Sequence, residues 1–374
     1  MAAERPLRVL MTADTVGGVW TYAVELARAL AARGIEVAVA TMGALPSAHQ
    51  RQELAGVAGV QLFASACKLE WMQDCWPDVD AAGQWLLALE REFAPDLVHL
   101  NQFDFGALPF RAPTLLVAHS CVLSWWRAVH GTAAPAEWCT YRTRVTQGLA
   151  GAALVAAPTR AMLGTLAENY GVDTARGLVL PNAADPALFA PAAKAHFVLA
   201  AGRFWDAAKN LAALEQVAPA LPWPVKVAGA AQHPDGGTVH AQHVQCLGEL
   251  PRAQLARTLS EAAVYALPAR YEPFGLSVLE AALSGCALVL GDIASLRETW
   301  GEAALYVPPD DPAALQRALL RLMEGEPERA RLAAAARSRA SHFSPVRQCE
   351  AYLQAYARLA PRFATAAPEE LACA

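Results

Sequence analysis

Two glutamates, Glu272 and Glu280, lie eight positions apart in the segment YEPFGLSVLE and are the most chemically suggestive pair in the sequence. Glu272 precedes Pro273, and a residue before proline is biased away from helix. The apolar spacing that follows predicts a helix that begins near Gly275 and runs through Leu276–Ser284. The free N–H groups at such a helix start attract anions. The segment therefore fits an elongated ligand with hydroxyls at both ends and phosphate between them. The alternative is an amphipathic helix with a solvated glutamate at each end.

Two cations, Arg203 and Lys209, follow a predicted strand in the segment AGRFWDAAKN. An arginine presents a planar fork of donors and a lysine a point charge, so two cations on one loop can converge on a diphosphate. The alternative is a pair of solvated surface charges.

Three residues follow predicted strands in the first half of the chain. Gly17 and Gly18 come after the first strand, where paired glycines let the backbone approach a phosphate closely. They lack the full dinucleotide pattern, so an ordinary tight turn stays open. His119 ends the strand LLVAHS and could orient a sugar hydroxyl or take part in proton transfer, with a structural histidine as the alternative.

Tryptophans near these strand ends are candidates for binding an acceptor. Trp125 and Trp126 follow His119, and Trp71 lies in the expected loop Leu69–Trp76. Aromatic faces suit sugar rings or apolar aglycones, although tryptophans equally pack cores.

Three further patterns are not interpreted as sites. The literal D-x-D at Asp78–Asp80 precedes a predicted helix, so we interpret it as a helix N-terminus capped by acids. His233, His240 and His243 lie in a loop-like stretch without recognisable ligand spacing. Ser120–Cys121 lacks the G-x-S-x-G elbow of hydrolases. We therefore expect no metal site and no resident cofactor.

The elements that must position these residues alternate strand and helix, which predicts mostly parallel sheets with helices on both faces. The predicted strands are residues 7–12, 35–40, 97–100, 115–118, 154–157, 197–201, 225–228, 264–266, 287–290 and 305–307. Prolines at 181, 186 and 191 interrupt the pattern. We therefore predict an α/β protein of two Rossmann-like domains, residues 1–192 and 193–345, followed by a terminal helix and a frayed end at 364–374. Ligands of such sheets bind beyond the carboxyl ends of the strands, where the candidate residues lie.

Composition narrows the class of protein. The 374 residues are 55% hydrophobic and 17% charged, with a formal net charge of −5. That charge gives no electrostatic case for nucleic-acid binding. No apolar run reaches the length of a transmembrane helix, and no secretory signal is visible. The eight cysteines form no C-x-x-C pair, which favours reduced thiols and a cytoplasmic location.

The sequence resembles the retaining glycosyltransferases of GT-B fold, and most closely glycosyltransferase family 4 (glycosyl transferases group 1). The likeness runs from Gly17–Gly18 through PNAADPALF and the Arg203/Lys209 spacing to YEPFGLSVLE, which looks like the family's E-x(7)-E element. It implies two Rossmann-like domains facing each other across a cleft, an acceptor domain first and a donor domain second. It also implies that the helix at 346–362 packs back onto the first domain. Asn210 stands where a glycine is usual, which we expect to change loop shape rather than charge.

The resemblance further implies metal-independent transfer of a sugar, with retention, from a UDP- or GDP-sugar to a hydroxyl of a glycan, glycolipid or small-molecule aglycone. Retaining hydrolases hold two carboxylates about 5 Å apart, closer than we expect for Glu272 and Glu280, so same-face attack is expected instead. The resemblance implies that His119 lies near the reacting sugar carbon and that Gly17–Gly18 lie beside the donor phosphate. It implies that Arg203, Lys209 and the helix start Phe274–Leu276 bind the leaving diphosphate. Glu272 would bind donor sugar hydroxyls, and Glu280 would bind the ribose.

Other classes stay open. One is a nucleotide-sugar epimerase or phosphorylase on the same fold. Another is a non-enzymatic bilobed sugar-binding protein, which would need an export signal. A peripheral membrane contact is compatible with the sequence, although no basic amphipathic stretch supports it.

Overall fold

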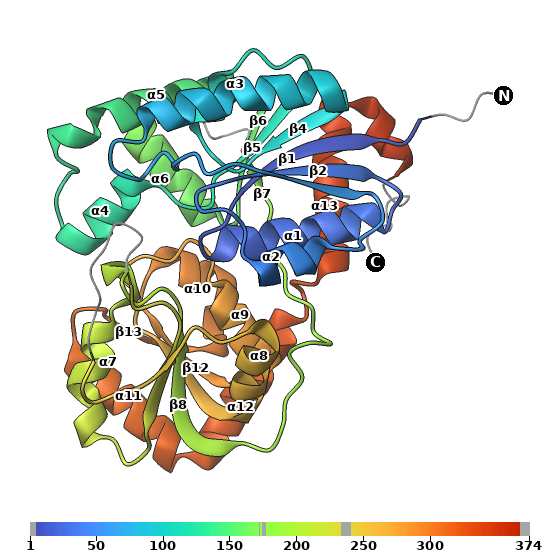
Figure 1. Ribbon diagram of the computed structural model, residues 1–374. Coiled ribbons are helices and arrows are strands. Elements are labelled where there is room, and N and C mark those ends of the chain that lie inside the picture. The colour runs from blue at the N-terminus through green and yellow to red at the C-terminus, as the bar shows by residue number, and fades with distance from the viewer. Residues whose placement is uncertain (1–4, 172, 174–176, 233–240, 367–374) are drawn as a thin grey trace. The chain divides into compact units, whose positions relative to one another are not determined.

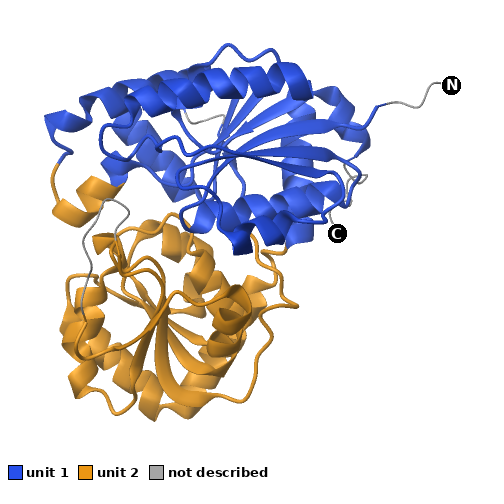
Figure 2. Ribbon diagram, viewed as in Figure 1, with its two compact units in different colours: residues 1–124, 133–182, 345–374 blue, residues 125–132, 183–344 orange. Residues whose placement is uncertain are grey.

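The computed structural model describes residues 5–171, 173, 177–232 and 241–366 (Figure 1). The chain divides into two compact units (Figure 2). Unit 1 comprises residues 1–124, 133–182 and 345–374, and unit 2 comprises residues 125–132 and 183–344. The sequence prediction placed the change of domain at about residue 192. In the structure the change comes directly after Asn182, and the backbone N–H of Ala184 already donates to Phe343 O within unit 2.

Unit 1 is built on a seven-stranded sheet in the order β3-β2-β1-β4-β5-β6-β7, with every neighbouring pair parallel. The strands are β1 (Arg8–Asp14), β2 (Glu36–Met42), β3 (Val60–Ala64), β4 (Leu97–Leu100), β5 (Thr114–Val117), β6 (Leu154–Ala157) and β7 (Leu178–Val179). This order reverses direction between β1 and β4. In open α/β sheets that reversal leaves a crevice beyond the carboxyl ends of the two strands, where ligands bind.

Helices cover both faces of this sheet (Figure 1). They are α1 (Gly18–Ala31), α2 (Ala48–Leu54), α3 (Trp76–Phe93), the start of α4 (Val122–His130), α5 (Cys139–Gly151), α6 (Arg160–Tyr170) and α13 (Pro345–Leu359). Side chains alternate along β1, so Val9 and Met11 pack with α1 and α13 while Leu10 packs with α3, α5 and α6. A sheet covered on both faces explains why its strands are apolar runs rather than alternating patterns.

Unit 2 repeats the same plan with a six-stranded parallel sheet in the order β10-β9-β8-β11-β12-β13. Its strands are β8 (Ala195–Ala201), β9 (Val225–Ala228), β10 (Gln245–Gly248), β11 (Ala262–Leu267), β12 (Ala287–Gly291) and β13 (Leu305–Val307). Its helices are α7 (Leu211–Val217), α8 (Arg252–Glu261), α9 (Leu276–Leu283), α10 (Ala294–Trp300), α11 (Pro312–Glu324) and α12 (Glu326–Ala340). Here the reversal falls between β8 and β11. Two core layers, one on each face, hold the helices against the sheet.

Most predicted elements have the expected type and nearly the expected bounds. β4, β6, β9 and β13 match residue for residue, and α9 ends one residue early. The edge strands β3, β7 and β10 were missed, because β7 is only two residues long and β3 and β10 are short, incompletely buried and interrupted by polar residues. β10 also follows closely after residues 233–240, which the structure does not describe.

The helix α3 begins earlier than predicted and corrects the interpretation of the D-x-D sequence. The residue before its first turn is Cys75, and no side chain caps the helix there. Asp78 lies inside the first turn, and Asp80 forms an ion pair of 2.6 Å with Arg144. The two acids therefore do not act as N-caps; Asp80 is part of a surface charge network with α5.

The C-terminal helix α13 belongs to unit 1, where it packs beside α1. Tyr352 and Tyr356 of this helix are fully buried, and Tyr356 Oη lies 2.7 Å from His99 Nδ1 in β4. A short 3-10 helix, Pro361–Thr365, follows and buries Phe363. Residues 367–374 of the predicted frayed end lie outside the described residues.

Within the part of the chain that the structure describes, no helix combines the length and the apolar character needed to span a bilayer. The seven cysteines in that part are all free thiols.

Candidate active site

The strongest polar contact at the carboxyl edge of the unit 2 sheet joins Lys209 and Glu272. Lys209 Nζ lies 2.6 Å from Glu272 Oε2, and their side chains are only 11% and 14% exposed. Lys209 follows β8 and Glu272 follows β11, the two strands at which the sheet order reverses. A semi-buried pair of this kind holds two opposite charges ready at the position where ligands of such sheets bind.

Arg203 lies on the same loop, and Asp206 holds it there. Arg203 Nη2 is 3.5 Å from Asp206 Oδ2, and its guanidinium lies 5.2 Å from the centre of the Trp205 ring. Asp206 is buried, and its Oδ1 also accepts the N–H of Ala208, which caps the 3-10 turn Ala207–Lys209. The sequence prediction missed Asp206, although an aspartate directly before a short helical turn is a recognisable cap signal. We call Arg203, Asp206, Lys209 and Glu272 the charged cluster.

Asn210 follows Lys209 and ends the 3-10 turn of this loop. Its backbone has the left-handed conformation, with φ 59° and ψ 46°, that a glycine would readily adopt. Its Nδ2 donates to Pro268 O at 2.9 Å and to Pro309 O at 2.8 Å, while its Oδ1 accepts from Arg270 Nη1 at 2.8 Å. Asparagine tolerates this conformation better than most residues. The side chain of Asn210 connects three strand-end loops, and the expectation that it changes the loop's shape stays a prediction.

The helix α9 begins next to the charged cluster, as the sequence predicted. Gly275 precedes its first residue, Leu276, with a φ of 90°. A Cβ at Gly275 would lie 3.0 Å from Val278 Cγ2 and 3.4 Å from Glu272 Cγ, so a larger residue would be both strained and crowded. Phe274 is buried against Phe343. The Phe274 ring therefore packs inside unit 2, and a ligand would contact the backbone of Phe274 instead.

Glu280 lies inside α9 and is 8% exposed, which excludes the interpretation of a solvated helix surface. Tyr265 in β11 connects the surroundings of both glutamates, because burial raises the pKa of its hydroxyl and the charges of Glu272 and Glu280 raise it further. That hydroxyl is held by Ser277 Oγ at 2.7 Å and Ala201 O at 3.0 Å.

In unit 1, Gly17 and Gly18 lie exposed at the start of α1. Gly17 has a φ of 80° and ends the loop after β1, and Gly18 is the first residue of the helix. The positive φ explains the glycine at position 17.

His119 follows β5 and belongs to a neutral network. Its Nε2 lies 2.8 Å from Asn101 Oδ1, and its ring packs on Tyr22 with 4.4 Å between centroids. Burial lowers the pKa of His119 to about 3, so it is neutral at physiological pH. A neutral imidazole can orient a hydroxyl but does not supply a proton as imidazolium. We call Thr12, Asn101 and His119 the neutral network, since Asn101 also bonds to Thr12 in β1.

His99 is a packing residue of the core, and its hydrogen-bond partners lie far away in the sequence. It is fully buried, with Nε2 at 3.1 Å from Tyr22 Oη and Nδ1 at 2.7 Å from Tyr356 Oη. Burial lowers its pKa to about 3, and the nearby His119 contributes in the same direction.

The three candidate acceptor tryptophans do not form one group. Trp71 lies half-buried on the core of unit 1, in the turns before α3. Trp125 and Trp126 are in the part of α4 that belongs to unit 2. Trp125 Nε1 donates to Asp206 Oδ1 at 2.8 Å, and the Trp126 ring lies 4.3 Å from the ring of His130.

Cys121 of the Ser120–Cys121 pair lacks the environment of a reactive thiol. Cys121 is buried, its Sγ lies 2.8 Å from Ser124 Oγ, and burial raises the pKa of its thiol. His233 and His240 lie outside the described residues. Among those described, no three His, Cys, Asp or Glu side chains converge as metal ligands would.

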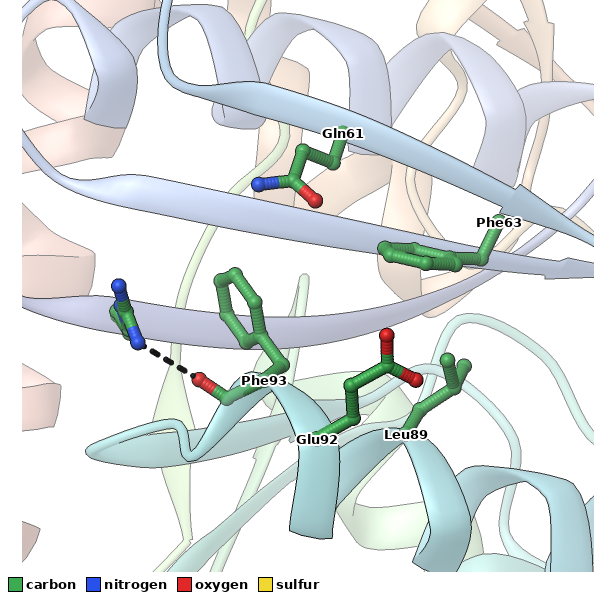
Figure 3. Close-up of a pocket in the computed structure, with 6 residues that line it drawn as sticks. Gln61, Phe63, Leu89, Glu92 and Phe93 are labelled. Atoms are coloured by element: carbon green, nitrogen blue, oxygen red, sulfur yellow. Dashed lines mark hydrogen bonds between the residues drawn. The ribbon is translucent and has the colours of Figure 1, made fainter.

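A cavity of about 210 Å³ lies elsewhere in unit 1 (Figure 3). It is lined by Arg8, Gln61, Phe63, Leu89, Glu92 and Phe93. Arg8 is engaged there with Phe93 O at 3.1 Å and with Glu36 at 2.8 Å. None of the candidate residues lines this cavity.

Two family descriptions match this chain. Residues 16–188 match "Glycosyltransferase Family 4", and residues 239–339 match "Glycosyl transferases group 1". The first match covers most of unit 1 and ends six residues beyond the change of unit at Asn182, and the second lies within unit 2. The chain belongs to the GT-B glycosyltransferases.

Solved glycosyltransferase structures have the same fold. A sucrose-phosphate synthase from Thermosynechococcus elongatus superposes with a TM-score of 0.78 at 20% identity, over 95% of this chain and 99% of that one. The Anabaena protein HepE in complex with UDP-glucose gives a TM-score of 0.74 at 16% identity, over 94% of this chain and 100% of that one.

Curated relatives match over a shorter stretch. The chain is 31% identical over 101 residues to the O-antigen chain mannosyltransferase B of Escherichia coli, and 37% identical over 95 residues to glycogen synthase of Mycobacterium tuberculosis. These stretches are 27% and 25% of this chain and 26% and 23% of those proteins, so the chain spans about a quarter of the curated relatives it matches.

Proposed function

We propose that this GT-B glycosyltransferase transfers a sugar from a nucleotide-sugar donor to a hydroxyl acceptor with retention of anomeric configuration. The observation that carries the proposal is the charged cluster. It sets a lysine, an arginine and a glutamate at the strand reversal of unit 2, next to the start of α9.

The main physical demand of sugar transfer is charge, which grows on the leaving diphosphate as the glycosidic bond breaks. Arg203, Lys209 and the first N–H groups of α9 would stabilise that charge. These groups are fixed before the donor arrives, since Asp206 and Glu272 already hold the two cations. We propose on this basis that transfer needs no metal ion. Gly17 and Gly18 are proposed to border the donor phosphate.

The glutamates are proposed to bind rather than to act as an acid/base pair. Glu272, paired with Lys209, would accept hydrogen bonds from donor sugar hydroxyls, and buried Glu280 would accept from the ribose. Same-face attack then lets the departing phosphate oxygen take the acceptor's proton, so no protein carboxylate needs to form a covalent intermediate.

His119 is proposed to orient a donor hydroxyl near the reacting carbon. Because burial keeps it neutral, its contribution is a hydrogen bond and not a proton transfer. The donor is proposed to be a UDP- or GDP-sugar. The complex of HepE with UDP-glucose supports the first of these by likeness of fold alone.

The acceptor is proposed to be a hydroxyl of a glycan, glycolipid or small aglycone, bound with the help of Trp71, Trp125 or Trp126. Trp125 is the weakest of these candidates, because its indole N–H is already engaged by Asp206. A cytoplasmic location stays a prediction from the sequence.

Product analysis tests the function. The protein is incubated with UDP- and GDP-sugars, with and without a panel of hydroxyl acceptors and with EDTA. Free nucleoside diphosphate should then appear together with a glycosylated acceptor, whose anomeric configuration NMR assigns. A new nucleotide-sugar formed without acceptor would instead establish an epimerase, and a sugar phosphate formed with inorganic phosphate would establish a phosphorylase. If no nucleotide-sugar is consumed or bound, the proposal fails.

A further inference from the structure

Three residues of unit 1 form a directed chain of hydrogen bonds that runs from His119, after β5, through Asn101, after β4, to Thr12 in β1. Asn101, after β4, donates its backbone N–H to Thr12 Oγ1 at 2.8 Å and its side-chain Nδ2 to Thr12 O at 2.5 Å. Its Oδ1 lies 2.8 Å from His119 Nε2. Thr12 and Asn101 are buried, so water does not compete for the hydrogen bonds between these two residues.

The chemistry of these atoms fixes where the hydrogens lie. Thr12 O is a carbonyl and can only accept, so the amide of Asn101 must turn its NH₂ toward Thr12. Asn101 then presents its carbonyl oxygen to His119. That oxygen also can only accept, so His119 Nε2 must carry the hydrogen of this contact.

A neutral imidazole has one N–H, so a hydrogen on Nε2 leaves a lone pair on Nδ1. His119 Nδ1 has no hydrogen-bond partner among the residues that the structure describes. Burial lowers the pKa of His119 to about 3, which keeps the ring in this one-proton state at neutral pH. The Tyr22 ring packs on the His119 ring, neutral His99 lies nearby, and neither of these residues brings a charge.

We propose that Asn101 is a positioning residue that locks His119 as the Nε2–H tautomer. The lone pair on Nδ1 is thereby presented to a hydroxyl group of the nucleotide-sugar donor. The part of this proposal that concerns the substrate rests on the proposed sugar transfer. The lock itself is a property of the folded protein and can be measured without any substrate.

The ring ¹⁵N chemical shifts of His119 separate protonated from unprotonated nitrogens and test the lock. Signals are assigned by their loss in His119→Gln. The wild type should show Nε2 protonated and Nδ1 unprotonated. Asn101→Leu, which removes the acceptor at similar size, should give a mixture of tautomers. Asn101→Ala serves as a second variant should the leucine disturb folding.

Gln102→Leu is the matched control. Gln102 is the buried neighbour of Asn101, and its side-chain amide makes no hydrogen bond to the described residues. Its loss should leave the shifts of His119 unchanged. For transfer, Asn101→Leu should lower kcat about tenfold, the effect of one neutral hydrogen bond, with KM for the nucleotide-sugar changed far less.

These experiments distinguish the tautomer lock of His119 from the role of its Nδ1 lone pair at the substrate. A wild-type His119 protonated on Nδ1, or a tautomer that Asn101→Leu and Asn101→Ala leave unchanged, would overturn the lock. A tautomer shift without a change in kcat would overturn the role of the lone pair at the substrate. If the lock is observed but no nucleotide-sugar reacts, the proposed transfer fails while the lock stands.

Discussion

The two units have the same strand order, yet the residues at their strand reversals are of opposite kinds. In unit 2 the charged cluster places Lys209 against Glu272 and Arg203 against Asp206. In unit 1 the neutral network connects Thr12, Asn101 and His119 without a formal charge at neutral pH.

The two units tolerate the burial of ionisable side chains in different ways. In unit 2 an acid lies beside each partly buried cation, Glu272 beside Lys209 and Asp206 beside Arg203, so each buried charge has a partner of opposite sign. His119 and His99 have no such partner, so burial drives them to the neutral state. The proposed roles follow this distinction, with the charged end stabilising a phosphate and the neutral end recognising hydroxyls. If this distinction holds, changes at the two ends should have different signatures.

The largest effect is expected from Lys209→Met, which keeps the length of the side chain and removes its charge. It also leaves Glu272 as an uncompensated acid where the diphosphate would lie. Turnover should fall by at least about 100-fold, as when one fixed group that stabilises transition-state charge is removed. Steady-state release of nucleoside diphosphate measures it.

Lys226→Met is the matched control in the same unit. Lys226 lies in β9, where its Nζ is 4.0 Å from the centre of the Phe197 ring. Near-normal turnover in Lys209→Met, or an equal loss in both variants, would remove Lys209 from the charged cluster's proposed role.

The buried histidine His99 of unit 1 should make the free energy of unfolding decrease in acid. The folded-state pKa of His99 is about 3, below the 6.5 of an ordinary histidine, so the unfolded chain binds the proton first. The contribution of His99 to stability is therefore present above pH 6.5 and is lost as the pH falls toward 3. Between pH 7 and pH 5 the free energy of unfolding should fall by about 2 kcal/mol from this group.

Denaturant titrations of the wild type and His99→Leu at pH 7 and pH 5 isolate this effect. The comparison of variants matters because Glu70, whose pKa burial raises to about 7, titrates with the opposite sign. The gap in stability between wild type and His99→Leu should narrow at pH 5. A gap of constant size would mean that His99 is not held neutral.

A smaller effect is expected from Glu280→Gln, which removes the charge of a buried acceptor inside α9. If Glu280 binds ribose hydroxyls, the affinity for nucleotide should weaken about tenfold, because a hydrogen bond to a charged group is worth about 1.5–3 kcal/mol and the amide keeps one acceptor. Calorimetric titration measures it, with Glu261→Gln at the exposed end of α8 as control. Unchanged affinity in Glu280→Gln would contradict the ribose role.

The sequence predicted well what depends on local pattern. The apolar strands end where the candidate residues begin, and the start of α9 at Gly275–Leu276 follows from proline, glycine and helical spacing. These signals are short-range, so they can be recognised without knowing what packs against them.

Contacts between residues that are far apart in the chain could not be predicted from the sequence. Lys209 and Glu272 are 63 positions apart, and no periodicity indicates that they pair. The capping role of Asp206 and the left-handed backbone of Asn210 depend on neighbouring loops. The hydrogen bond between His99 and Tyr356 joins residues 257 positions apart and requires α13 to return to unit 1.

The most direct test of the charged cluster is binding of its proposed ligand without chemistry. UDP and GDP are titrated calorimetrically, in EDTA, into the wild type, Lys209→Met and Lys226→Met. We expect one nucleoside diphosphate to bind the wild type and Lys226→Met alike, and to bind Lys209→Met at least about tenfold more weakly, since one charge-assisted contact is lost. Equal binding by all three proteins, or no binding of either nucleotide to the wild type, would contradict the central claim.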